Sequence, residues 1–279
     1  MKNRIPNQKT KLAAALSVLG LAGALWCLPA SATLISVGNT TVNIDPASAG
    51  NLTNWTVDTV SQLFQETFFY RIGATGPQFN LNTLPFTETL GLPIGTSQTD
   101  TVLYTGAGFT IQIAYGVTGG TAGSHISDIA EGIHITNTGN APIDFHFFEY
   151  SDFDLGGTAG GDTVSLLNPF VWRQSGDGFS LSETSGVPAA QRCEDAFFAS
   201  TLTSLTGGNY NLANANGLCG TVGPGDVTWA WQWDPTIAAG GGFIISKDKT
   251  LAAGTPEPGS LMLLGLGLAS LAAFRRKRA

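Results

Sequence analysis

Short runs of alternating apolar and polar residues, separated by turn-forming residues, fill the middle of the chain. Residues 109–115 (Phe-Thr-Ile-Gln-Ile-Ala-Tyr) alternate without a break, which is typical of a half-buried β-strand. Helix signals are scarce, and residues 188–205 permit one short helix. No repeat or linker divides the body. Residues 33–250 are therefore expected to be all-β, as a single large two-sheet β-sandwich (jelly-roll or Ig-like), with a two-domain sandwich as the alternative.

Two pairs of expected strands are separated by turn-rich segments, and each pair is predicted to form a hairpin. The runs at 132–136 and 143–147 flank Asn-Thr-Gly-Asn-Ala-Pro. Gly and Asn accept the positive φ of a tight turn, and Pro ends ladder pairing. The runs at 227–233 and 242–246 flank a second such segment.

Residues 1–32 have the pattern of a secretory signal helix. Four basic residues precede an apolar run at 12–28, and Ala30 and Ala32 form an A-x-A cleavage pattern before Thr33. The export translocon and signal peptidase are therefore expected partners. An uncleaved membrane anchor is the alternative.

Three features follow one another at the C-terminal end. They are the tripeptide Pro256, Glu257 and Pro258, an apolar run at 259–274, and the basic residues Arg275, Arg276, Lys277 and Arg278. The apolar run would form a transmembrane helix of roughly 24 Å, slightly short of the ~30 Å hydrocarbon core. Basic residues after such a run hold that end in the cytoplasm, so the body would face outward.

This order resembles the PEP-CTERM sorting signal of Gram-negative bacterial envelope proteins, over residues 255–279. In that family, an intramembrane processing enzyme (exosortase) recognises the Pro-Glu-Pro region and removes the tail. The resemblance implies an inner-membrane-anchored precursor that reaches the cell envelope, the outer surface or the extracellular space. The tripeptide and the basic cluster would be its sorting residues, and a plain C-terminal anchor is the alternative.

The body has a second, softer resemblance. Segments 150–156, 226–234, 237–242 and 245–249 are similar to a body type that recurs among PEP-CTERM proteins, and the last three look like its final strands. This resemblance supports one β domain and implies no mechanism.

The charge distribution narrows the classes of partner. Eight of the 13 basic residues lie in the two terminal segments, so residues 33–255 carry five basic and 19 acidic residues, a net charge of −14. Because nucleic-acid binding depends on neutralising phosphate, no nucleic-acid partner is expected. An apolar content of 43% also excludes disorder for most of the chain.

Two cysteines remain after the expected signal cleavage, Cys193 and Cys219. An even number of cysteines in an exported protein predicts a disulfide. Redox chemistry is the weaker alternative, because the sequence contains no Cys-x-x-Cys.

Asp152 and Asp154 lie two residues apart, and Asp162 follows a glycine-rich loop. Positions two apart on a strand share a face, and oxygen ligands on a flexible turn suit calcium. The pattern lacks the terminal Glu of an EF-hand, and a solvated acidic turn is the alternative. No other cofactor is expected.

Trp229, Trp231 and Trp233 fall on one face of an expected strand. An exposed strip of indoles could stack on sugar rings and so contact extracellular polysaccharide. The alternative is that the three indoles form the buried face of a sandwich strand.

Other catalytic or metal patterns are weak. His134 and His146 lie on the arms of the first expected hairpin with Glu131 nearby, but a third zinc ligand is not evident. Glu149, Asp152 and Asp154 would form a glycosidase-type pair only across a cleft. The sequence shows neither G-x-S-x-G nor a phosphate-binding GxxxxGK[ST].

These observations predict an exported, non-enzymatic protein of the cell surface or extracellular matrix, associated with exopolysaccharide. A carbohydrate- or calcium-binding β-sandwich module is the alternative. A secreted hydrolase is a further alternative from a different class.

Overall fold

The computed structural model describes residues 32–185, 188–215 and 219–254. The expected signal helix with Ala30, the Pro-Glu-Pro tripeptide, the apolar tail and the basic cluster lie outside these ranges. Within the ranges, no helix combines the length and the apolar composition that a membrane crossing requires.

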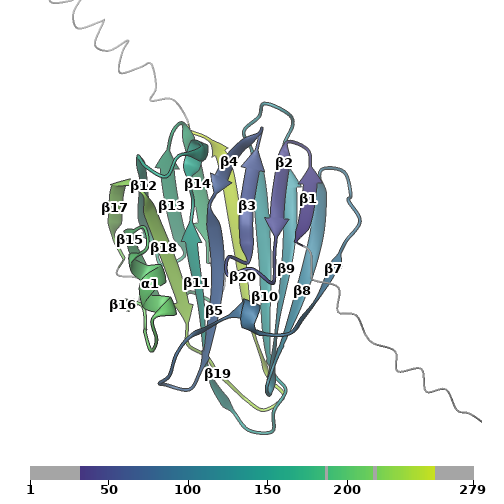
Figure 1. Ribbon diagram of the computed structural model, residues 1–279, viewed down its shortest axis with the longest axis vertical. Coiled ribbons are helices and arrows are strands. Elements are labelled where there is room, and N and C mark those ends of the chain that lie inside the picture. Colours follow the sequence, from purple (N-terminus) through teal and green to yellow (C-terminus); the bar gives the residue numbers. More distant parts are fainter. Residues whose placement is uncertain (1–31, 186–187, 216–218, 255–279) are drawn as a thin grey trace, which may run out of the picture. The chain divides into compact units, whose positions relative to one another are not determined.

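The strands of the described body form two antiparallel sheets (Figure 1). In the described ranges, sheet 1 holds 11 strands: β1 (Thr33–Val37), β2 (Thr40–Ile44), β3 (Leu52–Val57), β4 (Val60–Leu63), β5 (Gln65–Ile72), β6 (Phe79–Asn80), β11 (Ile143–Asp152), β15 (Arg192–Phe197), β16 (Asn214–Ala215), β18 (Val227–Trp233) and β19 (Thr236–Ile237). In the same ranges, sheet 2 holds nine: β7 (Phe86–Leu90), β8 (Ser97–Gly106), β9 (Phe109–Gly119), β10 (Ser127–Asn137), β12 (Asp162–Asn168), β13 (Val171–Gly176), β14 (Phe179–Thr184), β17 (Thr221–Gly225) and β20 (Gly242–Ala253). The expected all-β, two-sheet sandwich is confirmed.

The strand order joins segments that are distant in the chain. Sheet 1 runs β1-β2-β3-β5-β11-β18-β15-β16, and sheet 2 runs β17-β12-β13-β14-β20-β10-β9-β8-β7. Helical structure in the described ranges is limited to α1 (Ser200–Thr206) and the 3-10 turns η1 (Leu81–Thr83) and η2 (Leu155–Gly157).

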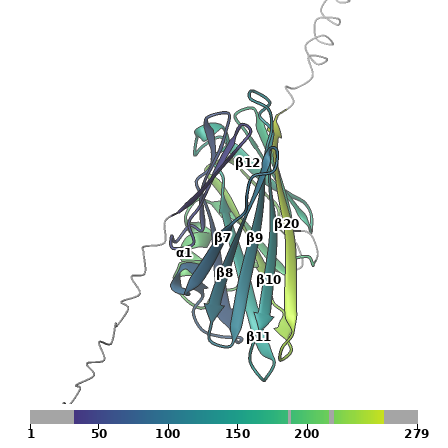
Figure 2. The same cartoon turned by 90° about the vertical axis from the view of Figure 1, so that its right-hand side faces the viewer.

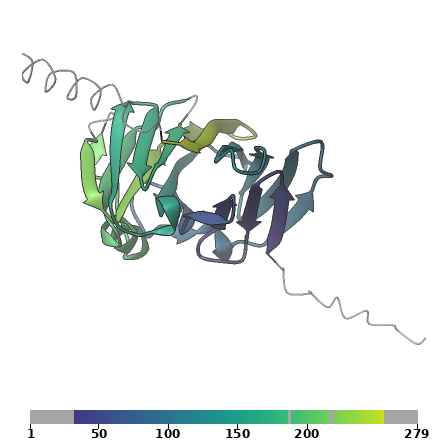
Figure 3. The ribbon, with the colours of Figure 1, turned by 90° about the horizontal axis from the view of Figure 1, so that it is seen from above.

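The two sheets face each other (Figures 2 and 3). The hydrophobic core, formed by residues of both, lies between them. In β9 the alternation of the sequence is kept, because every second residue from Phe109 to Tyr115 is buried and the residues between them are not. The expected strand at 109–115 is therefore confirmed. Across the core, the Tyr70 ring of sheet 1 lies 5.2 Å from the Phe109 ring of sheet 2, and Trp231 lies 5.5 Å from Trp172.

The centre of sheet 1 is buried on both faces. Every residue of β18 is buried, and so are all the residues of β11 after its first two. Phe148 and Tyr150 point away from the main core and pack with Leu205 of α1 and with Leu212. Figure 1 shows α1 over this part of the sheet. Because side chains on both faces are covered, β11 shows no regular alternation of apolar and polar residues in the sequence.

Both expected hairpins are wrong. β10 lies between β9 and β20 in sheet 2, whereas β11 lies between β5 and β18 in sheet 1. β18 and β20 also belong to different sheets, so each turn-rich segment carries the chain from one sheet to the other. Turn residues suit the backbone of a hairpin and the backbone of a connection between two sheets equally well. Only the long-range pairing of the strands distinguishes the two.

The helix expected within 188–205 is present only at its end. Arg192–Phe197 forms β15, which pairs antiparallel with β18, and α1 covers Ser200–Thr206. Pairing with a central strand overrides the weak helix propensity of this segment.

Cys193 of β15 and Cys219 form the expected disulfide, with their Cα atoms 6.0 Å apart. Cys193 is fully buried in the core. The bond ties β15 to the segment that precedes β17, across a sequence separation of 26 residues.

Replacing both cysteines, Cys193→Ala with Cys219→Ala, is expected to lower the free energy of unfolding by about 3–4 kcal/mol, because the unfolded chain regains the freedom of the closed loop. Urea unfolding of the processed protein measures this loss. Equal stability of the variant and the wild type would contradict it, as would free thiols in the denatured, unreduced wild type.

Candidate functional site

Six ionisable side chains meet inside the sandwich and are called the ion cluster here. Its members are Glu66, Glu131, Glu149, Glu183, Lys247 and Lys249. Each is at most 2% exposed. Charged groups are rarely buried this deeply unless they are paired.

Strand alternation directs the side chains of both lysines into the core. Lys247 and Lys249 lie on β20 between the buried residues Ile245 and Leu251, and all four share the inward face. Within sheet 2, β10 and β14 flank β20, with Glu131 directly opposite Lys247. Sheet 1 contributes the glutamates of β5 and β11 from across the core. The cluster therefore joins the two sheets.

The ammonium groups contact carboxylates of both sheets. Lys247 Nζ lies 3.1 Å from Glu66, 2.8 Å from Glu131 and 2.9 Å from Glu183, and it also contacts Glu149. Lys249 Nζ lies 2.7 Å from Glu66 and 2.6 Å from Glu131. In addition, Glu183 accepts a hydrogen bond of 2.8 Å from the Trp229 indole.

The surroundings shift the pKa values of the four carboxyl groups in two directions. Burial raises the pKa of Glu131 and Glu149, and neighbouring glutamates raise both further. For Glu66 and Glu183 burial acts in the same direction, but the charges of the two lysines outweigh it and lower the pKa of both. The cluster thus favours the protonated form of the first two glutamates and the ionised form of the other two.

The ion cluster has no access for a substrate, because its members are buried. Strand alternation in β11 also turns Glu149 into the core and Asp152 to the opposite side of sheet 1. The candidate pairing of Glu149 with Asp152 as hydrolase carboxylates is therefore wrong.

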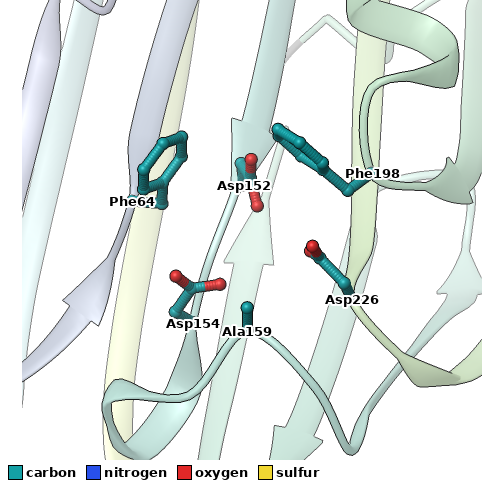
Figure 4. Close-up of a pocket in the computed structure, with 6 residues that line it drawn as sticks. All are labelled: Phe64, Asp152, Asp154, Ala159, Phe198 and Asp226. Carbon is teal, nitrogen blue, oxygen red and sulfur yellow. The ribbon is translucent and has the colours of Figure 1, made fainter.

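A second group of carboxylates lies at a pocket, called the acidic pocket here (Figure 4). Its lining residues are Phe64, Asp152, Asp154, Ala159, Phe198 and Asp226, around a cavity of about 210 Å³. Each aspartate places one carboxylate oxygen within 4.8 Å of those of the other two. Figure 4 shows the three carboxylates directed toward a common space, with the two phenyl rings beside it.

Separate parts of the chain position these carboxylates. Asp152 ends β11, Asp154 precedes η2, and Asp226 lies between β17 and β18. Phe64 donates a backbone hydrogen bond of 3.0 Å to the Asp152 carbonyl, and Phe198 donates one of 2.9 Å to the Asp226 carbonyl. Backbone contacts thus fix the rim of the pocket.

Asp162 is not part of the acidic pocket, so the expected trio is wrong in one member. Its carboxylate is buried and accepts hydrogen bonds from the Leu155 backbone (3.1 Å) and the Gln174 side chain. Gly176 leaves it room, since a Cβ there would lie 1.5 Å from the Asp162 Oδ1 atom. Asp162 therefore holds the loop that carries Asp154. Asp226, which the sequence did not indicate, lies beside Asp152 where Asp162 was expected.

The acidic pocket favours proton uptake by Asp152. Burial raises its pKa to about 8, with further contributions from the charges of Asp154 and Asp226. Asp152 is 1% exposed, and its Oδ1 atom has no hydrogen-bond partner among the described residues. Burial also raises the pKa of Asp154 and of Asp226.

The tryptophans are core residues. Trp229, Trp231 and Trp233 are each 0% exposed and stand among the aromatic rings between the sheets. A buried indole offers no face to a sugar ring, so the expectation of a glycan platform at these residues is wrong. The alternative, the buried face of a sandwich strand, is confirmed.

The histidines lie apart and assemble no zinc site within the described residues. His146 on β11 pairs with Asp234 at 2.5 Å through Nδ1, and His134 on β10 belongs to the other sheet. Glu131 faces the lysines of the ion cluster. The candidate combination of His146 with Glu131 therefore fails because β10 and β11 do not pair.

Several members of these two sites carry no recognisable motif: Glu66, Glu183, Asp226, Lys247 and Lys249. A signal exists for the lysines, because they share the period-two phase of the apolar residues Ile245 and Leu251 in a body that has only five basic residues. Asp226 gives no such signal, since it joins Asp152 only through the pairing of β11 with β18.

Comparison with known proteins confirms the resemblance of the C-terminal tail. The chain carries the PEP-CTERM protein-sorting motif at residues 255–278. This motif marks an exported protein that is anchored in the membrane and then processed by exosortase in the cell envelope. No curated protein matches the sequence.

Solved structures share the fold at very low identity. A bacterial glucoamylase complexed with acarbose is 6% identical over 83% of this chain, with a TM-score of 0.56, and the chain spans about a third (33%) of that protein's length. A galactose 1-epimerase from Lactobacillus acidophilus NCFM is 8% identical over 79% of this chain and 93% of its own, with a TM-score of 0.54. A galactose mutarotase-like protein from Clostridium acetobutylicum is 6% identical over 79% of this chain and 94% of its own, with a TM-score of 0.52. At these identities the likeness shows the fold alone.

Glu149→Gln and Glu66→Gln are expected to differ sharply in the ion cluster. Burial and the neighbouring glutamates raise the pKa of Glu149, which favours its neutral form, so an amide of the same shape should cost at most about 1 kcal/mol of unfolding free energy. The charges of the two lysines lower the pKa of Glu66, which favours its ionised form, and its loss should leave an uncompensated buried ammonium at a cost of about 3–5 kcal/mol. Urea unfolding at pH 7 measures both variants, and equal losses would contradict the assignment of protons.

Asp152→Asn is expected to change the dependence of stability on pH. Between pH 4 and pH 8 the folded wild type holds a proton on Asp152 that the unfolded chain has released, since its pKa rises from 3.8 to about 8 on folding. The contribution of Asp152 to the unfolding free energy of the wild type therefore falls as pH rises through this window. The variant, with no proton to release, should lose less stability in metal-free urea unfolding between pH 5 and pH 8. Parallel pH profiles would contradict this account.

Proposed function

We propose that this protein is a non-enzymatic component of the cell surface or extracellular matrix, associated with exopolysaccharide. The sorting motif at residues 255–278 carries the proposal, because it marks an exported protein processed in the cell envelope. The β-sandwich at residues 33–250 is the cargo that this route displays.

Two features of the body support a role without catalysis. The ion cluster, which is the densest set of acid–base groups described, is buried and neutralised internally. The acidic pocket offers three carboxylates without a histidine, lysine or arginine among its lining residues. General acid–base chemistry needs groups of matched pKa that reach a substrate, and the side chains of the ion cluster are buried away from one.

The proposed route uses both ends of the chain. The export translocon and signal peptidase act at the N-terminal segment, with cleavage after Ala32. The apolar tail then holds the body at the inner membrane, oriented by the basic cluster at 275–278. Exosortase acts at Pro-Glu-Pro, and the body reaches its final surface.

Replacing Pro256, Glu257 and Pro258 together by alanine tests this route in the native host. The wild type should leave the inner membrane with an intact mass that corresponds to residues 33 to near 256. The variant should stay in the inner-membrane fraction with its basic end attached, because the processing enzyme no longer recognises the tail.

Thr255→Ala is the matched control, since it alters the neighbouring position and keeps the tripeptide, and it should be processed like the wild type. A wild-type protein found in the cytosol with Met1 and Ala279 intact would overturn the proposal. Processing of the alanine variant at the normal rate would remove the tripeptide from the route.

A further inference from the structure

We propose that Asp152, Asp154 and Asp226 bind a divalent metal ion, and that the ion is calcium. One carboxylate oxygen from each lies within 4.8 Å of the other two, a spacing that a single ion with oxygen ligands at about 2.3–2.6 Å can bridge. The inference deepens the proposed function, because an exported body meets the calcium of the extracellular medium.

The acidic pocket differs from the ion cluster in having no internal cation. In the ion cluster, two lysines face four glutamates. Among the residues that line the acidic pocket, none is basic. Three converging carboxylates without a counter-charge destabilise one another, and a bound cation removes this repulsion.

Asp152 supplies the second, independent observation. Its side chain is 1% exposed and lines the acidic pocket, yet its Oδ1 atom meets no hydrogen-bond donor among the described residues. A buried polar atom without a partner is costly. Figure 4 shows this carboxylate between those of Asp154 and Asp226, where an ion would complete its coordination.

The geometry favours calcium over other cations. Calcium accepts six to eight oxygens in irregular arrangements, so three carboxylates and water on the open side suffice, whereas magnesium demands near-octahedral geometry. Phe64 and Phe198 stand 6.1 Å apart between ring centroids, with planes at 89°. Two phenyl rings beside carboxylates also suit an organic ammonium ion, which is the competing ligand.

Metal binding would tie three segments together. Asp152 belongs to the centre of sheet 1, Asp154 to the loop that η2 begins, and Asp226 to the turn between the edge strand β17 and the central strand β18. An ion at their meeting point stabilises the native body and leaves the unfolded chain unaffected. The surface protein would thus gain stability once it is outside the cell.

Thermal unfolding of the EDTA-treated full chain, purified in mild detergent, tests the site. Calcium should raise the Tm of the wild type saturably, by roughly 5–10 °C at free calcium 100 times the Kd. Asp226→Asn should abolish this rise. In EDTA the same variant should be as stable as the wild type or more stable, because one of three repelling carboxylates is gone.

Asp154→Asn is the second variant, and it should lose the calcium effect as Asp226→Asn does. If one of the two variants folds poorly, the other still tests the site. Asp248→Asn is the matched control. Asp248 lies on β20 of sheet 2, away from the acidic pocket, and its carboxylate neighbours that of Asp128. The control therefore also removes one of two neighbouring carboxylates, and it should keep the full calcium effect.

Three outcomes would overturn the inference: no saturable rise in the wild type, an equal rise in Asp226→Asn, or a rise with glucosamine hydrochloride and none with calcium. The last outcome would assign the acidic pocket to an organic ammonium ion. Each of them leaves the export route intact, because processing of the tail is measured separately by intact mass.

Discussion

The packing of the two sheets depends on the charges that Lys247 and Lys249 carry into the core. Removing a charged side chain from water costs several kcal/mol, and this cost is offset only where the ammonium group meets carboxylates in good geometry. Those carboxylates come from β10 and β14 on either side of β20 and from sheet 1 opposite. A register slip of one residue would turn both lysines to the other face and leave the glutamates without cations. The ion cluster therefore selects one register and one packing.

The same physical rule separates the two groups of acids in this protein. β11 directs Glu149 into the ion cluster and Asp152 into the acidic pocket, because successive side chains of a strand point to opposite faces. In the core, the four carboxyl groups surround two lysines. At the pocket, no basic residue stands among the lining residues, and burial raises the pKa of Asp152. The core therefore contains its own counter-ions, whereas the acidic pocket is the proposed site of an ion from outside.

Fold and destination belong to different parts of the chain. A glucoamylase and a galactose 1-epimerase share the sandwich at 6% and 8% identity, so the architecture tolerates almost any side chain that keeps the apolar alternation. Such a scaffold carries no chemistry of its own, and function resides in the sites placed on it. Here the sorting motif directs the scaffold to the cell envelope.

The sequence by itself determined the all-β class, strands such as β9 and β18, the disulfide and the sorting motif, because alternation, cysteine parity and a terminal motif are local properties. It also brought Asp152 and Asp154 together. Only the tertiary structure separated β10 from β11 into different sheets, buried the tryptophans and replaced Asp162 by Asp226. Those outcomes depend on which strands pair and what covers each face. The free energy of such long-range pairing is shared by residues far apart in the chain, and no short stretch of sequence contains it.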